Sequence, residues 1–98
     1  MANGFKKIRY ADSFSRDFKG LDQQQQLALR DCLEDLLKPI IPSSRRFHCV
    51  DKEKPKIYTV DLYTNVTTHK VSLQLDPADP NTALLRRVGQ HKDIDRKP

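Results

Sequence analysis

The sequence has no tryptophan and only two cysteines among its 98 residues. Cys32 and Cys49 form no Cys-x-x-Cys pair, and the three histidines are scattered at positions 48, 69 and 91. Neither a disulfide framework nor a zinc site has this spacing. We therefore interpret both cysteines as reduced thiols and expect no bound metal.

Long apolar segments are also absent. No uninterrupted apolar run exceeds a few residues, whereas a membrane-spanning helix needs about 20. The segment Met1–Lys7 lacks the apolar stretch of a secretory signal. We expect a single domain over residues 1–98 that is cytoplasmic and has no membrane partner.

Common catalytic motifs are missing as well. The chain has no Gly-x-Gly-x-x-Gly, no phosphate-binding P-loop, no His-Glu-x-x-His and no Gly-x-Ser-x-Gly. Nucleotide-driven, zinc-peptidase and serine-hydrolase activities therefore have no support, and no cofactor is expected.

Positive charge is what the sequence has in excess. Eighteen basic against thirteen acidic side chains give a net charge of +5. Residues 43–70 carry six basic and three acidic side chains, and residues 84–98 carry five and two. A basic second half favours a polyanion such as nucleic acid, or an acidic protein partner. Ordinary solubilising charge is the plainer alternative.

The N-terminal part predicts a short strand followed by two helices. Residues 8–10 are β-prone, and a helix capped by Asp12 or Ser13 should end at Gly20. A second helix should begin after Asp22, with Gln25 completing a capping box, and should end at the prolines at 39 and 42. Its expected apolar stripe is Leu29, Leu33, Leu36, Leu37 and Ile40, with Cys32 beside it.

From residue 46 onward, apolar and polar residues alternate, which predicts strands. The expected strands cover residues 46–50, 57–62, 70–75 and 83–88, with a loop at 76–81 and a polar tail from Gly89. The element order β-α-α-β-β-β-β indicates an α+β fold with two N-terminal helices on one face of an antiparallel sheet. We expect the other face to be partly open and to gather basic side chains.

These basic side chains suit one kind of chemistry. The cluster consists of His48, Lys52, Lys54, Lys56, His69, Lys70, Arg86, Arg87, His91 and Lys92. RNA cleavage by transesterification needs a base, an acid and cations around the phosphate, and histidine can fill either proton role near neutral pH. No metal is required.

Each of these residues also has a plainer interpretation. His48 could be one side of an exposed strand, and His69 a neighbour of a turn. The three lysines at 52, 54 and 56 could be edge charges that deter aggregation. Arg86 and Arg87 should point to opposite faces of a strand, so that only one of them joins a given site.

Three segments resemble the RelE/ParE superfamily of bacterial type II toxins. Residues 8–21 resemble its opening strand and helix, and residues 45–50 resemble its central Arg-x-His-x-Leu strand. Residues 84–94 are similar to its closing Leu-x-Arg-x-Gly-x-His-x-Asp pattern, which is the most specific of the three. The resemblance covers nearly the whole chain and is greatest to the RelE/YafQ-like mRNA interferase branch.

The resemblance implies a toxin that cleaves mRNA in the ribosomal A site and is held inactive by a cognate acidic antitoxin. By position it implies His91 as general acid, His48 as base, and Arg87 with Lys70 as phosphate holders. Many members have Tyr or Phe four residues after the position of His91, where this chain has Asp95. The family's usual glycine after the central strand is also absent.

Two other functions stay open on the sequence alone. A ParE-type toxin would inhibit DNA gyrase by binding, without cleaving RNA, although that branch generally lacks the paired Arg87 and His91. A catalytically weakened homologue would bind RNA or an antitoxin on the same fold, and Asp95 favours that alternative.

Overall fold

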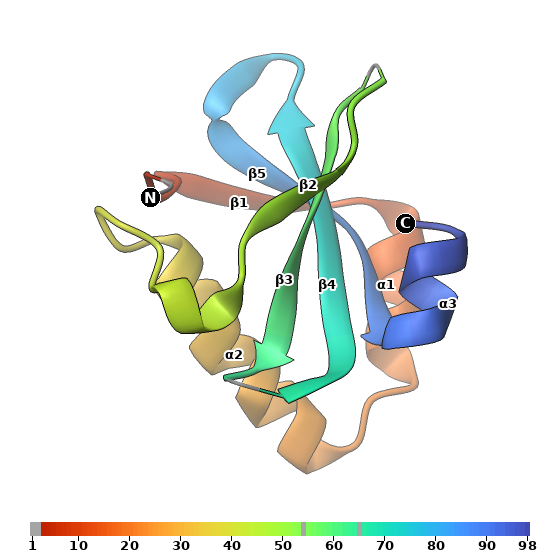
Figure 1. Cartoon of the computed structure of the whole chain (residues 1–98). Helices are drawn as coiled ribbons and strands as arrows, with labels where there is room; N and C mark the ends of the chain where they lie inside the picture. Colours follow the sequence, from red (N-terminus) through yellow and green to blue (C-terminus); the bar gives the residue numbers. More distant parts are fainter. Residues whose placement is uncertain (1–2, 54, 65) are drawn as a thin grey trace.

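Five strands form one sheet in the order β1-β5-β4-β3-β2 in the computed structural model, which describes residues 3–53, 55–64 and 66–98 (Figure 1). The strands are β1 (Lys7–Tyr10), β2 (His48–Asp51), β3 (Ile57–Tyr63), β4 (Val66–Asp76) and β5 (Asp79–Gln90). Strands β2 to β5 pair antiparallel, as predicted. The predicted α+β class is confirmed, but β1 runs parallel to β5, so the sheet is mixed. The two helices that follow β1 make this parallel arrangement possible, because parallel strands need a long crossover connection.

Both predicted N-terminal helices are present. Helix α1 (Asp12–Lys19) follows β1, and α2 (Gln23–Leu36) begins with the predicted capping box between Asp22 and Gln25. Two details differ from expectation. The N-cap of α1 is Ala11, which makes no side-chain cap bond. Helix α2 ends at Leu36, before Pro39, because a proline disfavours helical backbone in the residue that precedes it.

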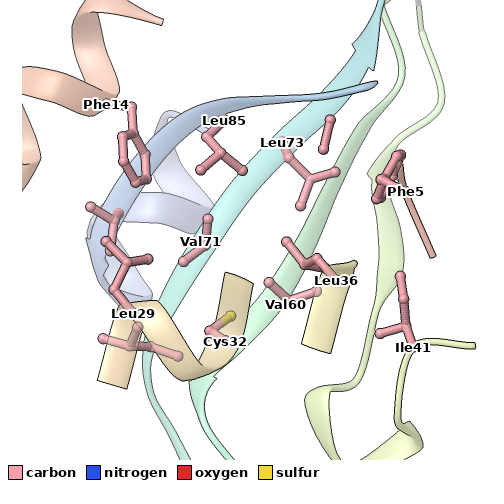
Figure 2. Packing of buried hydrophobic residues seen from close by; sticks show 13 residues of the cluster. Phe5, Phe14, Leu29, Cys32, Leu36, Ile41, Val60, Val71, Leu73 and Leu85 are labelled. Carbon is pink, nitrogen blue, oxygen red and sulfur yellow. The ribbon is translucent and has the colours of Figure 1, made fainter. Parts of the chain in front are cut away.

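The core lies between α2 and the sheet (Figure 2). Its members from the helices include Phe14, Leu29, Cys32 and Leu36, and those from the strands include Val60, Leu62, Val71, Leu73 and Leu85. The predicted stripe of α2 is therefore correct at Leu29, Cys32 and Leu36. It is wrong at Leu37 and Ile40, which lie beyond the helix end and are exposed. Burial also raises the pKa of the Cys32 thiol to about 12, so this cysteine stays protonated at neutral pH.

The connection between β4 and β5 is a tight turn and not the predicted loop at 76–81. Asp76 opposes Asp79 across the hairpin. The carboxylate of Asp76 accepts a hydrogen bond from the Ala78 N–H (2.9 Å), and the carboxylate of Asp79 accepts one from the Asn81 N–H (2.9 Å). These side chains stabilise the turn locally, so both strands extend up to it.

The predicted polar tail is structured as well. Residues 89 and 90 complete β5, and His91–Arg96 form a short helix, α3. Figure 1 shows α3 and the C-terminus on the side of the sheet away from α2. Ile94 anchors α3 and is fully buried. Helix α3 and the residues after it therefore cover the β4–β5 part of the second sheet face, which the sequence predicted to be partly open.

None of the helices in the described ranges combines the length and the apolar character that crossing a bilayer requires.

Two adjacent leucines test this packing. Leu36→Ala should lower the free energy of unfolding by about 2–5 kcal/mol, because Leu36 is fully buried and its loss leaves a cavity. Leu37→Ala is the matched control, since Leu37 is 45% exposed, and it should change stability by less than about 0.5 kcal/mol. Urea denaturation measures both, and equal losses would contradict the described core.

Candidate functional site

A row of four residues crosses the sheet on the face opposite the core. His48 pairs with Thr59, Thr59 with Ser72, and Ser72 with Arg87. Residues paired across strands point to the same face, so all four share it. The backbones of His48 and Arg87 are separated by about 14 Å, since neighbouring strands lie about 4.8 Å apart. We call these four residues the cross-sheet row.

A bulge in β5 places Arg86 and Arg87 on this same face. The register between β4 and β5 shifts after Ser72, so that Leu85 opposes Leu73 and Arg86 is the additional residue. Arg86 donates hydrogen bonds to the side-chain oxygen of Gln74 and to the backbone oxygen of Pro98. The prediction that these two arginines point to opposite faces is therefore wrong, because a bulge interrupts the alternation of a strand.

Arg87 is held by a carboxylate from α1. Its Nε lies 2.9 Å from one oxygen of Asp17 and its second guanidinium nitrogen lies 3.2 Å from the other, which makes the pair bidentate. The same carboxylate accepts the Val88 N–H (3.1 Å). The hydrogen bonds that Arg87 donates to Asp17 raise the pKa of Arg87, so the guanidinium stays charged.

Helix α1 thus takes the place of a strand beside the second half of β5. Strand β1 pairs with β5 only as far as Leu85. Beyond that point the Ser13 hydroxyl donates to the Arg86 carbonyl (2.6 Å), and Asp17 accepts from Val88. These two side chains satisfy backbone groups that an open sheet edge would leave unpaired.

Lys70, His91 and Asp95 form a second cluster next to the row. Lys70 pairs with Gly89 of β5 and is buried, and its Nζ lies 3.6 Å from a carboxylate oxygen of Asp95. The other oxygen of Asp95 lies 2.8 Å from Nδ1 of His91. Asp95 therefore contacts both the lysine expected to hold phosphate and the histidine expected to donate a proton.

His48 has a defined tautomer. It is exposed, and its Nδ1 lies 2.6 Å from the carbonyl oxygen of Arg46. A carbonyl oxygen can only accept, so Nδ1 carries the hydrogen. In the neutral ring Nε2 is then left as the acceptor, which is the state that a general base requires.

Another predicted RNA contact, His69, lies apart from this face. His69 precedes Lys70 in the strand and points to the other side, where its Nε2 lies 3.5 Å from the side chain of Gln25 and its ring packs edge-on against Tyr63. The exposed Lys52 and Lys56 flank the connection between β2 and β3. Lys92 is exposed on α3, and Lys54 lies outside the described residues.

Several solved structures share the fold of this chain. One chain of the RelB–RelE antitoxin–toxin complex from Methanococcus jannaschii matches 92% of this chain and 99% of its own length, with a TM-score of 0.62 and 17% identity. A chain of the toxin–antitoxin complex RelBE2 from Mycobacterium tuberculosis has a TM-score of 0.63 and 15% identity, over 89% of this chain and 92% of that one. In the DinJ–YafQ complex from E. coli the TM-score is 0.62 and the identity 17%, over 91% of this chain and 97% of that one.

The chain has the fold of RelE-like toxins. The likeness is structural, since no protein-family model and no curated protein sequence matches the chain. The fold suggested by the three sequence segments is therefore confirmed.

Sequence reasoning missed three features of the site. Asp17 gave no signal, because its partner Arg87 lies 70 residues away along the chain. Ser72 occupies a polar position in the alternating pattern of residues 70–75, and that pattern gives no sign of a site. Asp95 was seen as a departure from the family pattern, and its contacts with Lys70 and His91 could not be anticipated without α3.

The bidentate pair between Asp17 and Arg87 can be tested by measuring the free energy of unfolding of a variant that lacks it. Asp17→Ala should lower the free energy of unfolding by about 1–3 kcal/mol, because it removes a charge-assisted bond and leaves the Val88 N–H without its acceptor. Asp31→Ala, on the exposed face of α2, should cost less than about 0.5 kcal/mol. Thermal and urea unfolding measure both variants, and equal effects would show that Asp17 does not secure the edge of β5.

Proposed function

We propose that this chain is the toxin of a type II toxin–antitoxin system and that it cleaves mRNA in the ribosomal A site. The observation that carries the proposal is that Arg87, Lys70 and His91 gather at one end of a single sheet face. The fold shared with RelE and YafQ structures supports the toxin assignment. Ribosomes and mRNA would place the chain in the cytoplasm.

The proposed reaction is a metal-independent transesterification. The ribose 2′-oxygen loses its proton to a base and forms a bond to the adjacent phosphorus. The bond from phosphorus to the 5′-oxygen breaks, and that oxygen takes a proton from an acid. Charge on the phosphate rises in the transition state, and fixed cations stabilise it.

The geometry suggests how these tasks divide. Arg87 and Lys70 hold the phosphate. Asp95 contacts both Lys70 and His91, so His91 lies close to Lys70, and we assign His91 the role of the general acid. His48 carries a free Nε2 suited to the base, but it stands at the far end of the cross-sheet row from Arg87. Arg86, Lys52, Lys56 and Lys92 would bind the RNA backbone beyond the reacting phosphate, whereas His69 lies on the other side of the sheet and takes no part.

A second candidate function rests on Asp95. A carboxylate in contact with Lys70 and His91 competes with a phosphate for both and repels the anionic RNA. A catalytically weakened homologue that binds RNA or an antitoxin would tolerate this arrangement. A ParE-type gyrase inhibitor is the third alternative, and a gyrase supercoiling assay distinguishes it.

Cleavage is tested by primer extension on an mRNA translated in a cell-free system. The wild-type protein should produce new 5′ ends that require ribosomes. His91→Ala should reduce their rate of formation about 10²–10⁴-fold through loss of the acid, and Arg87→Ala about 10²–10³-fold through loss of charge stabilisation. His48→Ala should cost less than His91→Ala, because His48 lies farther from the phosphate held by Arg87.

The control for these variants is Arg30→Ala, which removes an exposed arginine from α2, on the other side of the sheet. Its cleavage should equal that of the wild type. No ribosome-dependent cleavage by the wild-type protein would refute the interferase proposal, and full activity in both Arg87→Ala and His91→Ala would refute the assigned site.

An antitoxin partner has a place to bind on this chain. A groove of about 960 Å³ runs between α1 and α2 and along β1. Its lining includes four large apolar side chains with exposed fractions between 38% and 57%: Tyr10, Phe18, Leu27 and Leu37. Lys19 and Arg30 also line it against one acidic side chain, Glu34, so an acidic amphipathic segment would match both its apolar floor and its net positive charge.

The partner is expected to be a small acidic protein encoded beside this chain. Co-expressed with it, the wild-type chain should co-purify as a stable complex. Leu27→Asp should weaken that complex at least about tenfold, because it places a charge in the apolar groove. Leu75→Asp, at a leucine that is 42% exposed and outside the groove, should leave affinity unchanged. Titration calorimetry measures both, and equal affinity would exclude the groove as the docking site.

A further inference from the structure

The last residues of the chain lie over the candidate site. Ile94 is fully buried and anchors α3 on β4 and β5; a Cβ added at Gly89 of β5 would lie in van der Waals contact with its Cδ1. From this anchor, residues 95–98 continue across the face that carries the cross-sheet row. Ser72 is fully buried beneath them, and Lys70 is 8% exposed.

Residues 95–98 supply acceptors to the cations that the proposed function needs. Asp95 pairs with Lys70. The backbone oxygen of Pro98 accepts from Nε of Arg86 (3.2 Å) and from the hydroxyl of Ser72 (2.8 Å). The backbone oxygen of Lys97 accepts from the guanidinium of Arg87 (3.3 Å).

These contacts have the chemistry of a phosphate complex. Arginine, lysine and serine donate to phosphate oxygens in protein–RNA contacts, and each donor here points to a carboxylate or carbonyl oxygen instead. Two acceptors cannot occupy the same donor positions at once. RNA that used Lys70, Ser72, Arg86 and Arg87 together would therefore have to displace residues 95–98.

We propose that residues 95–98 occlude the RNA site of this chain and must move away before single-stranded RNA can bind. The identity of the ligand rests on the proposed function; the occlusion is a property of the fold. The pair between Asp95 and Lys70 adds little to the cost of displacement, because Asp95 is 43% exposed and a pair at such a site is weak. Ile94 can remain in place, since it lies N-terminal to the displaced segment.

A variant that ends at Ile94 tests the proposal, because occlusion and net charge predict opposite changes in its affinity for RNA. It loses one acidic and two basic side chains, so its net charge falls from +5 to +4. Charge alone then predicts weaker RNA binding. Occlusion predicts tighter binding by about tenfold, the effect of one regained charge-assisted contact.

The probe is a fluorescently labelled single-stranded 2′-O-methyl RNA oligonucleotide, which cannot be cleaved because its 2′-oxygen is blocked. Fluorescence anisotropy gives the dissociation constant for the wild type and the shortened variant, and circular dichroism confirms that both are folded. Adding Arg87→Ala to the shortened variant should abolish the gain in affinity.

A full-length variant keeps the test decisive if shortening disturbs the fold. Asp95→Asn should tighten binding about threefold by releasing Lys70. Asp31→Asn makes the same change of charge on α2 and should leave affinity at the wild-type level. The proposal is overturned if folded variants bind no more tightly than the wild type, or if Asp95→Asn and Asp31→Asn have equal effects.

The RNA-binding test of occlusion and the cleavage test of the proposed function can fail independently of each other. Tighter binding by the shortened variant, with no ribosome-dependent cleavage by any form, would uphold occlusion and refute the interferase. Ribosome-dependent cleavage by a wild type whose affinity does not rise on shortening would uphold the interferase and overturn occlusion.

Discussion

Strand β5 is the element on which the rest of the structure depends. One of its edges pairs with β4 along the hairpin, and the other is divided between β1 and the side chains of α1. The bulge at Arg86 lies where this division occurs. It turns two successive arginines to one face and brings the second within reach of Asp17. The geometry of the candidate site thus follows from how both edges of a single strand are satisfied.

Local patterns in the sequence were enough to predict most of the elements. Alternation identified β3 and β4 because one side of each strand is packed against the helices, and the capping box marked the start of α2. Patterns failed where distant residues decide the outcome. The parallel pairing of β1, the burial of Ile94 and the bulge in β5 each depend on partners far away along the chain. Helix α3 was missed because only one of its residues is buried.

The candidate site divides in the same way. Arg87, Lys70 and His91 were named from the sequence, and the structure gathers them because β4 and β5 are neighbours and α3 begins where β5 ends. His69 was named with them but alternation turns it to the other side. Asp17, which holds Arg87, and Ser72, which donates to the backbone of Pro98, have no sequence pattern of their own. Their importance comes from hydrogen bonds that exist only after the chain has folded.

The bond between Asp17 and Arg87 joins residues that are 70 positions apart. During synthesis, the bond can therefore form only after the segment that contains β5 has left the ribosome. A partly made chain has helix α1 but no positioned arginine and no α3. If the target is the ribosome, the guanidinium of Arg87 takes up its fixed position only after β5 has emerged and folded against α1.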